Sequence, residues 1–142
     1  MKKCSDVMTE EVVYCVPGDV VTRVAQLMKT EDIGPVLIVD NEESRKLVGI
    51  VTDRDLALKV VADGRDPNTT TVEDVMTRKL ITCRADDDVE AALKAMAQYQ
   101  LRRIPVVDDS MRLVGIISQA DVATRVDEPE KTAEVVKEIS EP

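Results

Sequence analysis

Two short segments combine a hydroxyl side chain with an aspartate three positions later. Thr52 precedes Asp55, Ser118 precedes Asp121, and each pair follows a short apolar run. An ionised aspartate only accepts hydrogen bonds and has two oxygens, so it can accept both ribose hydroxyls of a nucleotide. The N-terminus of a helix beginning here would favour a phosphate. The same spacing also suits a helix-capping arrangement without any ligand, and spacing alone favours that interpretation.

Arginines form a second group with possible chemistry. Arg102 and Arg103 are adjacent, and the planar guanidinium pairs bidentately with phosphate oxygens. Arg54 lies between Thr52 and Asp55 and could place a further positive charge beside that pair. The alternative for Arg102 and Arg103 is a pair of solvated charges where a helix meets a strand.

The inventory of other reactive groups argues against an enzyme. The chain has no histidine, which removes the commonest general base and zinc ligand. It has no phosphate loop of the GxxxxGK[ST] kind and no nucleophile elbow. Cys4, Cys15 and Cys83 lack CxxC spacing, so we expect neither a disulfide framework nor a metal site. Cys15 and Cys83 are predicted to pack as small apolar residues.

Composition limits the partners. The net charge of −9 opposes binding to nucleic acid. No apolar run approaches the roughly 20 residues that cross a bilayer, and the N-terminus lacks a signal-peptide core. We therefore expect a cytoplasmic protein without membrane contact. With no Phe or Trp and two Tyr, the core must be aliphatic.

An internal repeat organises the chain. The string Asp-Val-Met-Thr at 6–9 returns at 74–77, an offset of 68. The string Leu-Val-Gly-Ile at 47–50 returns at 113–116, an offset of 66. The first copy therefore has two extra residues in the turn 41–46. Two copies of this length indicate a duplicated domain.

Each copy is predicted to have the same order of elements. In the first, an extended segment at 12–16 precedes a helix capped at Asp19, a hairpin of 36–39 with 47–51, and a helix over 53–62. The second has a helix capped by the aspartates at 86–88, a hairpin of 104–107 with 113–117, and a helix from 119. The predicted domains are 5–62 and 73–126, with a linker at 63–72 and a charged tail or short helix at 127–142.

These strings resemble the cystathionine-β-synthase (CBS) domain in a tandem pair, or Bateman module. The resemblance rests on the repeated Val-Met-Thr opening, the string Arg-Ile-Pro-Val-Val-Asp at 103–108, Leu-Val-Gly-Ile-Val-Thr-Asp at 47–53, and the two Thr/Ser-x-x-Asp endings. It covers roughly 5–126 and is closest to stand-alone bacterial CBS-pair proteins. It implies an α+β fold of two βαββα units packed about a pseudo-twofold axis.

The resemblance also implies site residues in the cleft between the copies. Phosphate and ribose would contact Ser118, Asp121, Arg102, Arg103, Thr52, Asp55 and Arg54. Adenine at the Ser118 site would lie against Val13, Ile33, Gly34 and Ile116. At the Thr52 site it would lie against Ile81, Leu101 and Ile50. At the position of Arg102 and Arg103 the first copy has Gly34 and Pro35, so the sites are unequally equipped.

The function implied is a non-enzymatic sensor for AMP, ADP, ATP, NAD or S-adenosylmethionine. Such a module signals to a downstream protein by conformational change and forms a homodimer. No cofactor is required, although magnesium could arrive with the nucleotide's phosphates. The alternative is a structural interaction or dimerisation protein without a small-molecule ligand.

Overall fold

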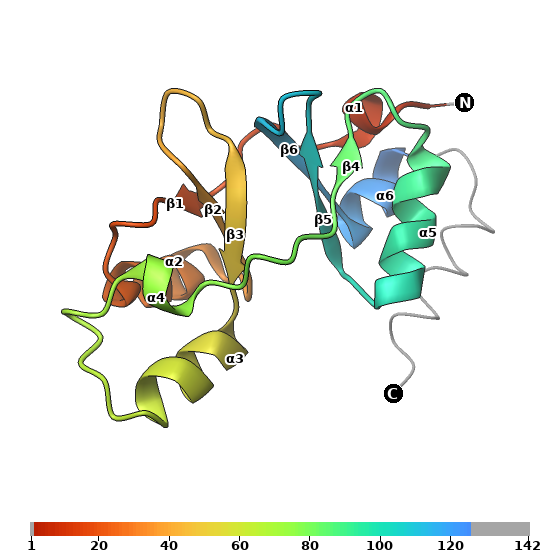
Figure 1. The fold of residues 1–142 in the computed structure, drawn as a ribbon. Coiled ribbons are helices and arrows are strands. Elements are labelled where there is room, and N and C mark those ends of the chain that lie inside the picture. Colours follow the sequence, from red (N-terminus) through yellow and green to blue (C-terminus); the bar gives the residue numbers. More distant parts are fainter. Residues whose placement is uncertain (1, 126–142) are drawn as a thin grey trace. The chain divides into compact units, whose positions relative to one another are not determined.

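The computed structural model describes residues 2–125, and the predicted tail at 127–142 lies outside them. The chain divides into two compact units. Unit 2 comprises Val13–Leu80, and the described part of unit 1 comprises residues 2–12 and 81–125. The chain therefore passes from one unit to the other after Val12 and again after Leu80 (Figure 1).

Unit 2 contains a three-stranded mixed sheet. β1 (Tyr14–Cys15) pairs parallel with β2 (Val36–Val39), which pairs antiparallel with β3 (Leu47–Val51). Helix α2 (Val21–Glu31) connects β1 to β2, as a parallel pair requires. This antiparallel pairing confirms the predicted hairpin. β2 is buried throughout, and β3 alternates between buried and half-buried residues.

The last helical segment of unit 2 is irregular. The sequence predicts one helix over 53–62, and the structure has α3 (Asp53–Leu56) followed by the π-helical segment η1 (Ala57–Val61). At the end of η1 the N–H of Ala62 donates to the carbonyl of Ala57, five residues earlier, which is the wider hydrogen-bonded turn of a π-helix. A π-bulge of this kind leaves no simple sequence signal.

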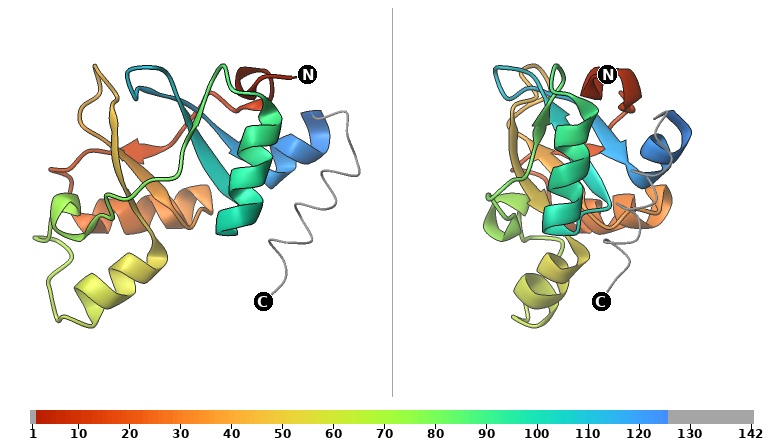
Figure 2. Two further views of the ribbon diagram at one scale, coloured as in Figure 1. Left: turned by 45° about the vertical axis from the view of Figure 1, so that its right-hand side comes forward. Right: turned by 90° about the vertical axis from the view of Figure 1, so that its right-hand side faces the viewer.

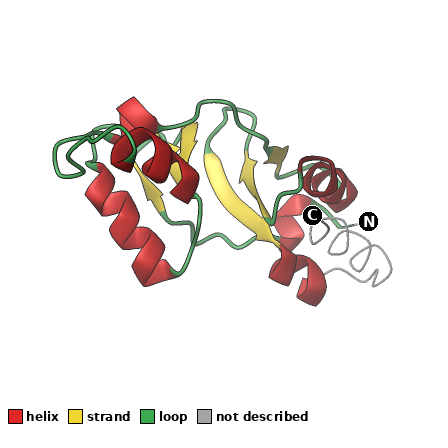
Figure 3. Ribbon diagram, turned by 90° about the horizontal axis from the view of Figure 1, so that it is seen from below, coloured by secondary structure: helices red, strands yellow, loops and turns green. Residues whose placement is uncertain are grey.

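Unit 1 repeats this order. β4 (Cys83–Arg84) pairs parallel with β5 (Arg103–Val107), which pairs antiparallel with β6 (Leu113–Ser118). Helix α5 (Val89–Tyr99) connects β4 to β5, and α6 (Gln119–Arg125) follows β6. Both units therefore have the predicted βαββα order and form the predicted α+β fold, with helices beside the strands of each sheet (Figure 3).

Two short helices exchange places between the repeats. α1 (Cys4–Val7) precedes the first repeat in the sequence but belongs to unit 1, where the N–H of Cys4 donates to the carbonyl of Asp87. α4 (Val72–Val75) precedes the second repeat but belongs to unit 2 and lies beside the start of α2 (Figure 2). The repeated Asp-Val-Met-Thr string is thus the segment that each repeat contributes to the other's unit.

Each unit has its own aliphatic core, as the composition predicts. The largest fully buried side chains include Ile38 in unit 2 and Met96, Ile104 and Ile117 in unit 1. Cys15 and Cys83 are buried at equivalent strand positions, which confirms their apolar role. Burial raises the pKa of the Cys15 thiol to about 11, so this thiol is protonated at neutral pH.

The predicted cap of α2 at Asp19 is wrong, whereas the N-cap of α5 is one of the predicted aspartates. The N-cap of α2 is Val20, and the carboxylate of Asp19 instead accepts the N–H of Val16 at 3.0 Å. Asp88 is the N-cap of α5 but makes no side-chain cap hydrogen bond. In each unit an aspartate instead closes the turn between the first strand and the helix by accepting the N–H three residues before it, Asp19 from Val16 and Asp87 from Arg84.

Within residues 2–125, none of the helices is long and apolar enough to span a membrane.

Candidate functional site

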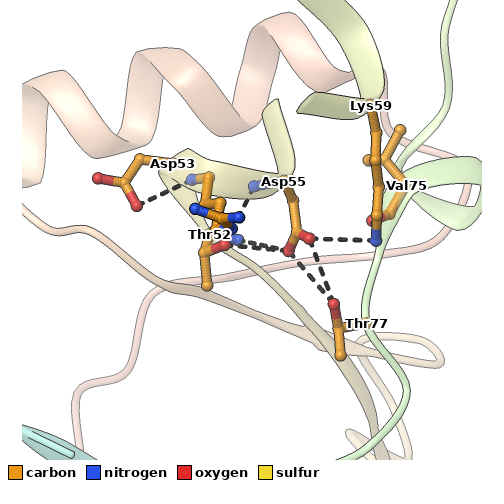
Figure 4. A network of polar contacts seen from close by, with 7 residues as sticks. Thr52, Asp53, Asp55, Lys59, Val75 and Thr77 are labelled. Carbon is orange, nitrogen blue, oxygen red and sulfur yellow. Dashed lines mark hydrogen bonds and ion pairs between the residues drawn. The ribbon is translucent and has the colours of Figure 1, made fainter. Parts of the chain in front are cut away.

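The Thr52–Asp55 pair forms a closed hydrogen-bonded box at the start of α3 (Figure 4). The backbone N–H and the hydroxyl of Thr52 donate to Asp55 Oδ2 at 2.9 and 3.1 Å. The N–H of Asp55 lies 3.2 Å from Thr52 Oγ1, which completes the reciprocal capping box. The capping interpretation of this spacing is therefore realised in the structure.

Two residues that sequence reasoning missed complete this network. The hydroxyl of Thr77 lies 3.3 and 3.4 Å from the two carboxylate oxygens of Asp55. Lys59 Nζ lies 3.1 Å from Asp55 Oδ1 and donates to the carbonyl of Val75 at 2.9 Å (Figure 4). Lys59 stands four residues after Asp55, the spacing of one helical turn, and Thr77 belongs to the repeated string. The i, i+4 spacing is thus a sequence signal for Lys59, whereas the contact of Thr77 with Asp55 depends on tertiary packing.

The Ser118–Asp121 pair forms the same box in unit 1. The N–H and hydroxyl of Ser118 donate to Asp121 Oδ2 at 3.0 and 3.1 Å, and the N–H of Asp121 lies 3.2 Å from Ser118 Oγ. The hydroxyl of Thr9 donates to Asp121 Oδ1 at 3.0 Å. Thr9 and Thr77 occupy equivalent positions of the repeat, so the two units carry one arrangement twice.

Both carboxylates are largely buried, with Asp55 9% and Asp121 8% exposed. Burial by itself would raise the pKa of Asp55. Hydrogen bonds from Thr52 and Lys59 and the positive charge of Lys59 outweigh it, and the pKa of Asp55 lies below the ordinary 3.8. Asp55 is thus held ionised as a hydrogen-bond acceptor at neutral pH.

This lowered pKa makes part of the stability depend on pH. A carboxylate with a depressed folded-state pKa contributes stability above its unfolded pKa and loses it as the pH falls through the folded value. We expect the difference in unfolding free energy between wild type and Asp55→Asn to be full at pH 7 and to shrink below pH 3.8. Urea unfolding of both proteins from pH 7 to pH 3 measures it. A difference that stayed constant over this range would show that Asp55 is not specifically stabilised as a carboxylate.

The arginines lie close to the second box in the fold. Arg103 is the first residue of β5 and is the cross-strand partner of Ser118. Arg102 accepts the N–H of Gln119 through its carbonyl at 3.2 Å. Both side chains are exposed, as is that of Arg54 beside the first box. Exposed arginines therefore lie beside both boxes, Arg54 at the first and Arg102 and Arg103 at the second, and the first box also contains Lys59.

The apolar residues predicted to hold adenine are half-buried, apart from the exposed Gly34. Ile50 and Ile116 each exchange backbone hydrogen bonds with the threonine of the neighbouring Met-Thr segment. The remaining aliphatic residues divide between unit 2 (Val13, Ile33) and unit 1 (Ile81, Leu101). Ile33, Ile81 and Leu101 pack against the cores of their own units, as ordinary core residues do.

A separate hollow lies at the other end of the unit 2 sheet and contains none of the predicted site residues. Its volume is about 310 Å³, and its lining residues are Tyr14, Cys15, Val16, Asp19, Arg23, Asp40, Asn41 and Glu42. Between residues 2 and 125, no group of three or more His, Cys, Asp or Glu side chains is placed to hold a metal ion.

Comparison with known proteins identifies the class of fold. The model of the CBS domain matches residues 4–62 and 72–128. The chain is 38% identical over 141 residues to the uncharacterized protein YlbB of Bacillus subtilis, covering 99% of this chain and 93% of that protein. The chain therefore belongs to the CBS-domain family and contains a tandem pair of these domains, like its stand-alone relatives.

Solved structures agree with this assignment. Hypoxic response protein 1 of Mycobacterium tuberculosis, whose crystal structure holds two coordinated zinc ions, superposes with a TM-score of 0.75 at 34% identity, over 88% of this chain and 99% of that one. The CBS domain pair of protein MJ0100, solved in complex with 5′-methylthioadenosine and S-adenosyl-L-methionine, gives a TM-score of 0.70 at 30% identity, over 87% and 94% of the two chains. CBS pairs of this fold serve as regulatory modules.

Proposed function

We propose that this protein is a non-enzymatic regulatory module that binds an adenine nucleotide at the Thr52–Asp55 and Ser118–Asp121 boxes. The observation that carries the proposal is the duplicated box, in which a hydroxyl residue at the end of the last strand of each sheet is followed by a buried aspartate. An ionised carboxylate at this position suits the two hydroxyls of a ribose. The MJ0100 complexes support adenosine-containing ligands for a relative of this fold.

The ligand is proposed to be AMP, ADP or ATP, with NAD and S-adenosylmethionine as the other adenine-containing candidates. The exposed guanidinium groups of Arg102, Arg103 and Arg54 would neutralise phosphate, with or without magnesium. The protein is proposed to act as a homodimer and to signal to a downstream protein by conformational change. The absence of a histidine from the sequence supports a role in binding over one in acid–base catalysis.

One observation favours the alternative of a purely structural interaction protein. Both carboxylates already accept hydrogen bonds from their own chain, so neither box needs a ligand to be satisfied. A thermal-shift series with AMP, ADP, ATP, NAD and S-adenosylmethionine separates the two functions, because a ligand of the native state raises the melting temperature with its concentration. No shift with any of the five at millimolar concentration would favour the structural role.

The two sites are expected to differ in affinity. Unit 1 has Arg102 and Arg103 where unit 2 has Gly34 and Pro35, and one charge-assisted hydrogen bond to phosphate contributes roughly 1.5–3 kcal/mol, or more than tenfold in affinity. We expect calorimetric titration with AMP to show a tighter site that is lost in Asp121→Ala and kept in Asp55→Ala.

The reverse pattern has a definite meaning. A tighter site that survives Asp121→Ala and disappears in Asp55→Ala would assign the stronger phosphate contact to Arg54. AMP affinity unchanged in both variants would mean that the two aspartates only cap their helices and do not bind ribose.

A further inference from the structure

Each candidate ribose carboxylate is bonded to a segment through which the chain passes from one unit to the other. Thr9 lies three residues before the first crossing, after Val12, and Thr77 lies three residues before the second, after Leu80. The hydroxyl of Thr9 donates to Asp121 at 3.0 Å, and that of Thr77 reaches both oxygens of Asp55 at 3.3 and 3.4 Å. The two covalent crossings are therefore anchored in the same way.

Backbone pairing fixes the same segments. The N–H and carbonyl of Thr9 pair with Ile116 at 2.8 and 3.0 Å, and those of Thr77 pair with Ile50 at 2.8 and 2.9 Å. Each pairing adds a single bridge to the last strand of the unit's sheet. An isolated bridge has only two backbone hydrogen bonds, so the stability of each segment depends strongly on its side-chain contacts.

A methionine beside each threonine lies directly over a strand glycine. A Cβ atom at Gly115 would stand 2.6 Å from Met8 Sδ, and one at Gly49 would stand 2.7 Å from Met76 Sδ. The glycine of the Leu-Val-Gly-Ile string thus makes room for the methionine of the Val-Met-Thr string. The segments Met8–Thr9 and Met76–Thr77 are called the Met–Thr latches below.

The acceptor capacity of the carboxylate links these latches to the candidate ligand. A carboxylate has about four lone-pair positions. Those of Asp55 already serve the N–H and hydroxyl of Thr52, the ammonium of Lys59 and the hydroxyl of Thr77. Two ribose hydroxyls must therefore replace two of these donors, and the hydroxyls of Thr52 and Thr77 are the uncharged side-chain donors that can rotate away.

We propose that a ribose bound at each aspartate displaces the threonine hydroxyl of the Met–Thr latch and so loosens the chain crossing that follows it. This inference rests on the proposed function and names the regulatory element of the same site. The binding state of Asp121 is thereby transmitted to residues 9–12, and that of Asp55 to residues 77–80. Coupling between two such events is reciprocal, so loosening a latch must strengthen ligand binding.

The decisive measurement compares the affinities of two ligands, AMP and 2′,3′-dideoxy-AMP, for the wild type and for two threonine variants. Thr77→Val and Thr9→Val remove the competing hydroxyl at nearly constant volume. The loss of one hydrogen bond from the free protein, about 1 kcal/mol, is expected to tighten AMP binding roughly fivefold at the affected site. For 2′,3′-dideoxy-AMP, which has no hydroxyls to compete, the same variants should leave the affinity unchanged.

Two variants serve as controls. Thr77→Ser keeps a hydroxyl and should bind AMP like the wild type. Thr71→Val alters the N-cap residue of α4, six residues before Thr77, whose side chain makes no cap hydrogen bond. This variant should bind both ligands with unchanged affinity. If the wild type binds AMP and Thr77→Val and Thr9→Val bind it equally well or more weakly, displacement of the hydroxyl is wrong while the proposed function stands.

Limited proteolysis measures the local opening of the latch and does not depend on the affinity for a nucleotide. Arg78 and Lys79 are exposed directly after Thr77 and offer a trypsin site at the crossing. Cleavage of a locally opened segment follows its equilibrium population, so ligand-free Thr77→Val should be cut here about fivefold faster than Thr71→Val. AMP should accelerate this cut in wild type, and dideoxy-AMP should not.

These readouts separate the two ideas. Failure of AMP to bind wild type rejects the proposed nucleotide function, whereas equal cleavage of ligand-free Thr77→Val and Thr71→Val rejects the latch. Glu10 and Glu11, exposed after Thr9, provide the corresponding glutamyl-protease site at the first crossing and the same comparison for Thr9→Val.

Discussion

Replacing Ile104 by alanine is expected to lower the free energy of unfolding by about 3–4 kcal/mol, the largest stability effect among the variants considered. Ile104 lies in β5, between β4 and β6, and is 0% exposed. The core around it is aliphatic, and close-packed interiors collapse only partly into the space left by a truncated side chain. Urea unfolding at pH 7 gives the change.

Val61→Ala is the matched control for this substitution. Val61 is 76% exposed at the end of η1, so its truncation should change stability by less than about 0.5 kcal/mol. A cost for Ile104→Ala as small as that of the control would mean that β5 is not the centre of the unit 1 core.

Introducing a side chain at Gly115 is expected to have the next largest effect. The Cβ of Gly115→Ala would stand 2.6 Å from Met8 Sδ and 3.0 Å from the carbonyl oxygen of Thr9. The sulfur can move, but the carbonyl belongs to the bridge with Ile116 and cannot move without weakening it. We expect a loss of about 1–3 kcal/mol in urea unfolding, typical of overpacking.

A second substitution identifies the cause of that loss. Met8→Ala removes the atoms that the new methyl group would meet, so the double variant should be more stable than the sum of the two single losses by about 1 kcal/mol. Gly18→Ala is the control, because a Cβ at Gly18 has no heavy atom within 4 Å. Strictly additive losses would show that Met8 and Gly115 are not in contact.

The local features of this fold were predictable because each has a short-range physical signature. Runs of β-branched residues separated by a polar turn predicted the β2–β3 and β5–β6 hairpins, and apolar spacing predicted α2 and α5. The unequal repeat offsets predicted the longer turn in the first copy, where Asp40 bonds to Lys46 while Asp108 bonds to Arg112. The Thr/Ser-x-x-Asp spacing allowed both a ligand role and a capping box, and the box is present in both units.

The location of the repeated Asp-Val-Met-Thr string was decided by tertiary structure alone. Sequence order places 6–9 with the first repeat and 74–77 with the second, yet each string packs in the other repeat's unit. Strand pairing with Ile116 or Ile50 and the space above Gly115 or Gly49 determine this choice, and both are contacts between residues far apart in the chain. The same long-range packing brings Thr9 to Asp121 and Thr77 to Asp55, because a hydrogen bond depends on distance in space and leaves no trace in sequence spacing.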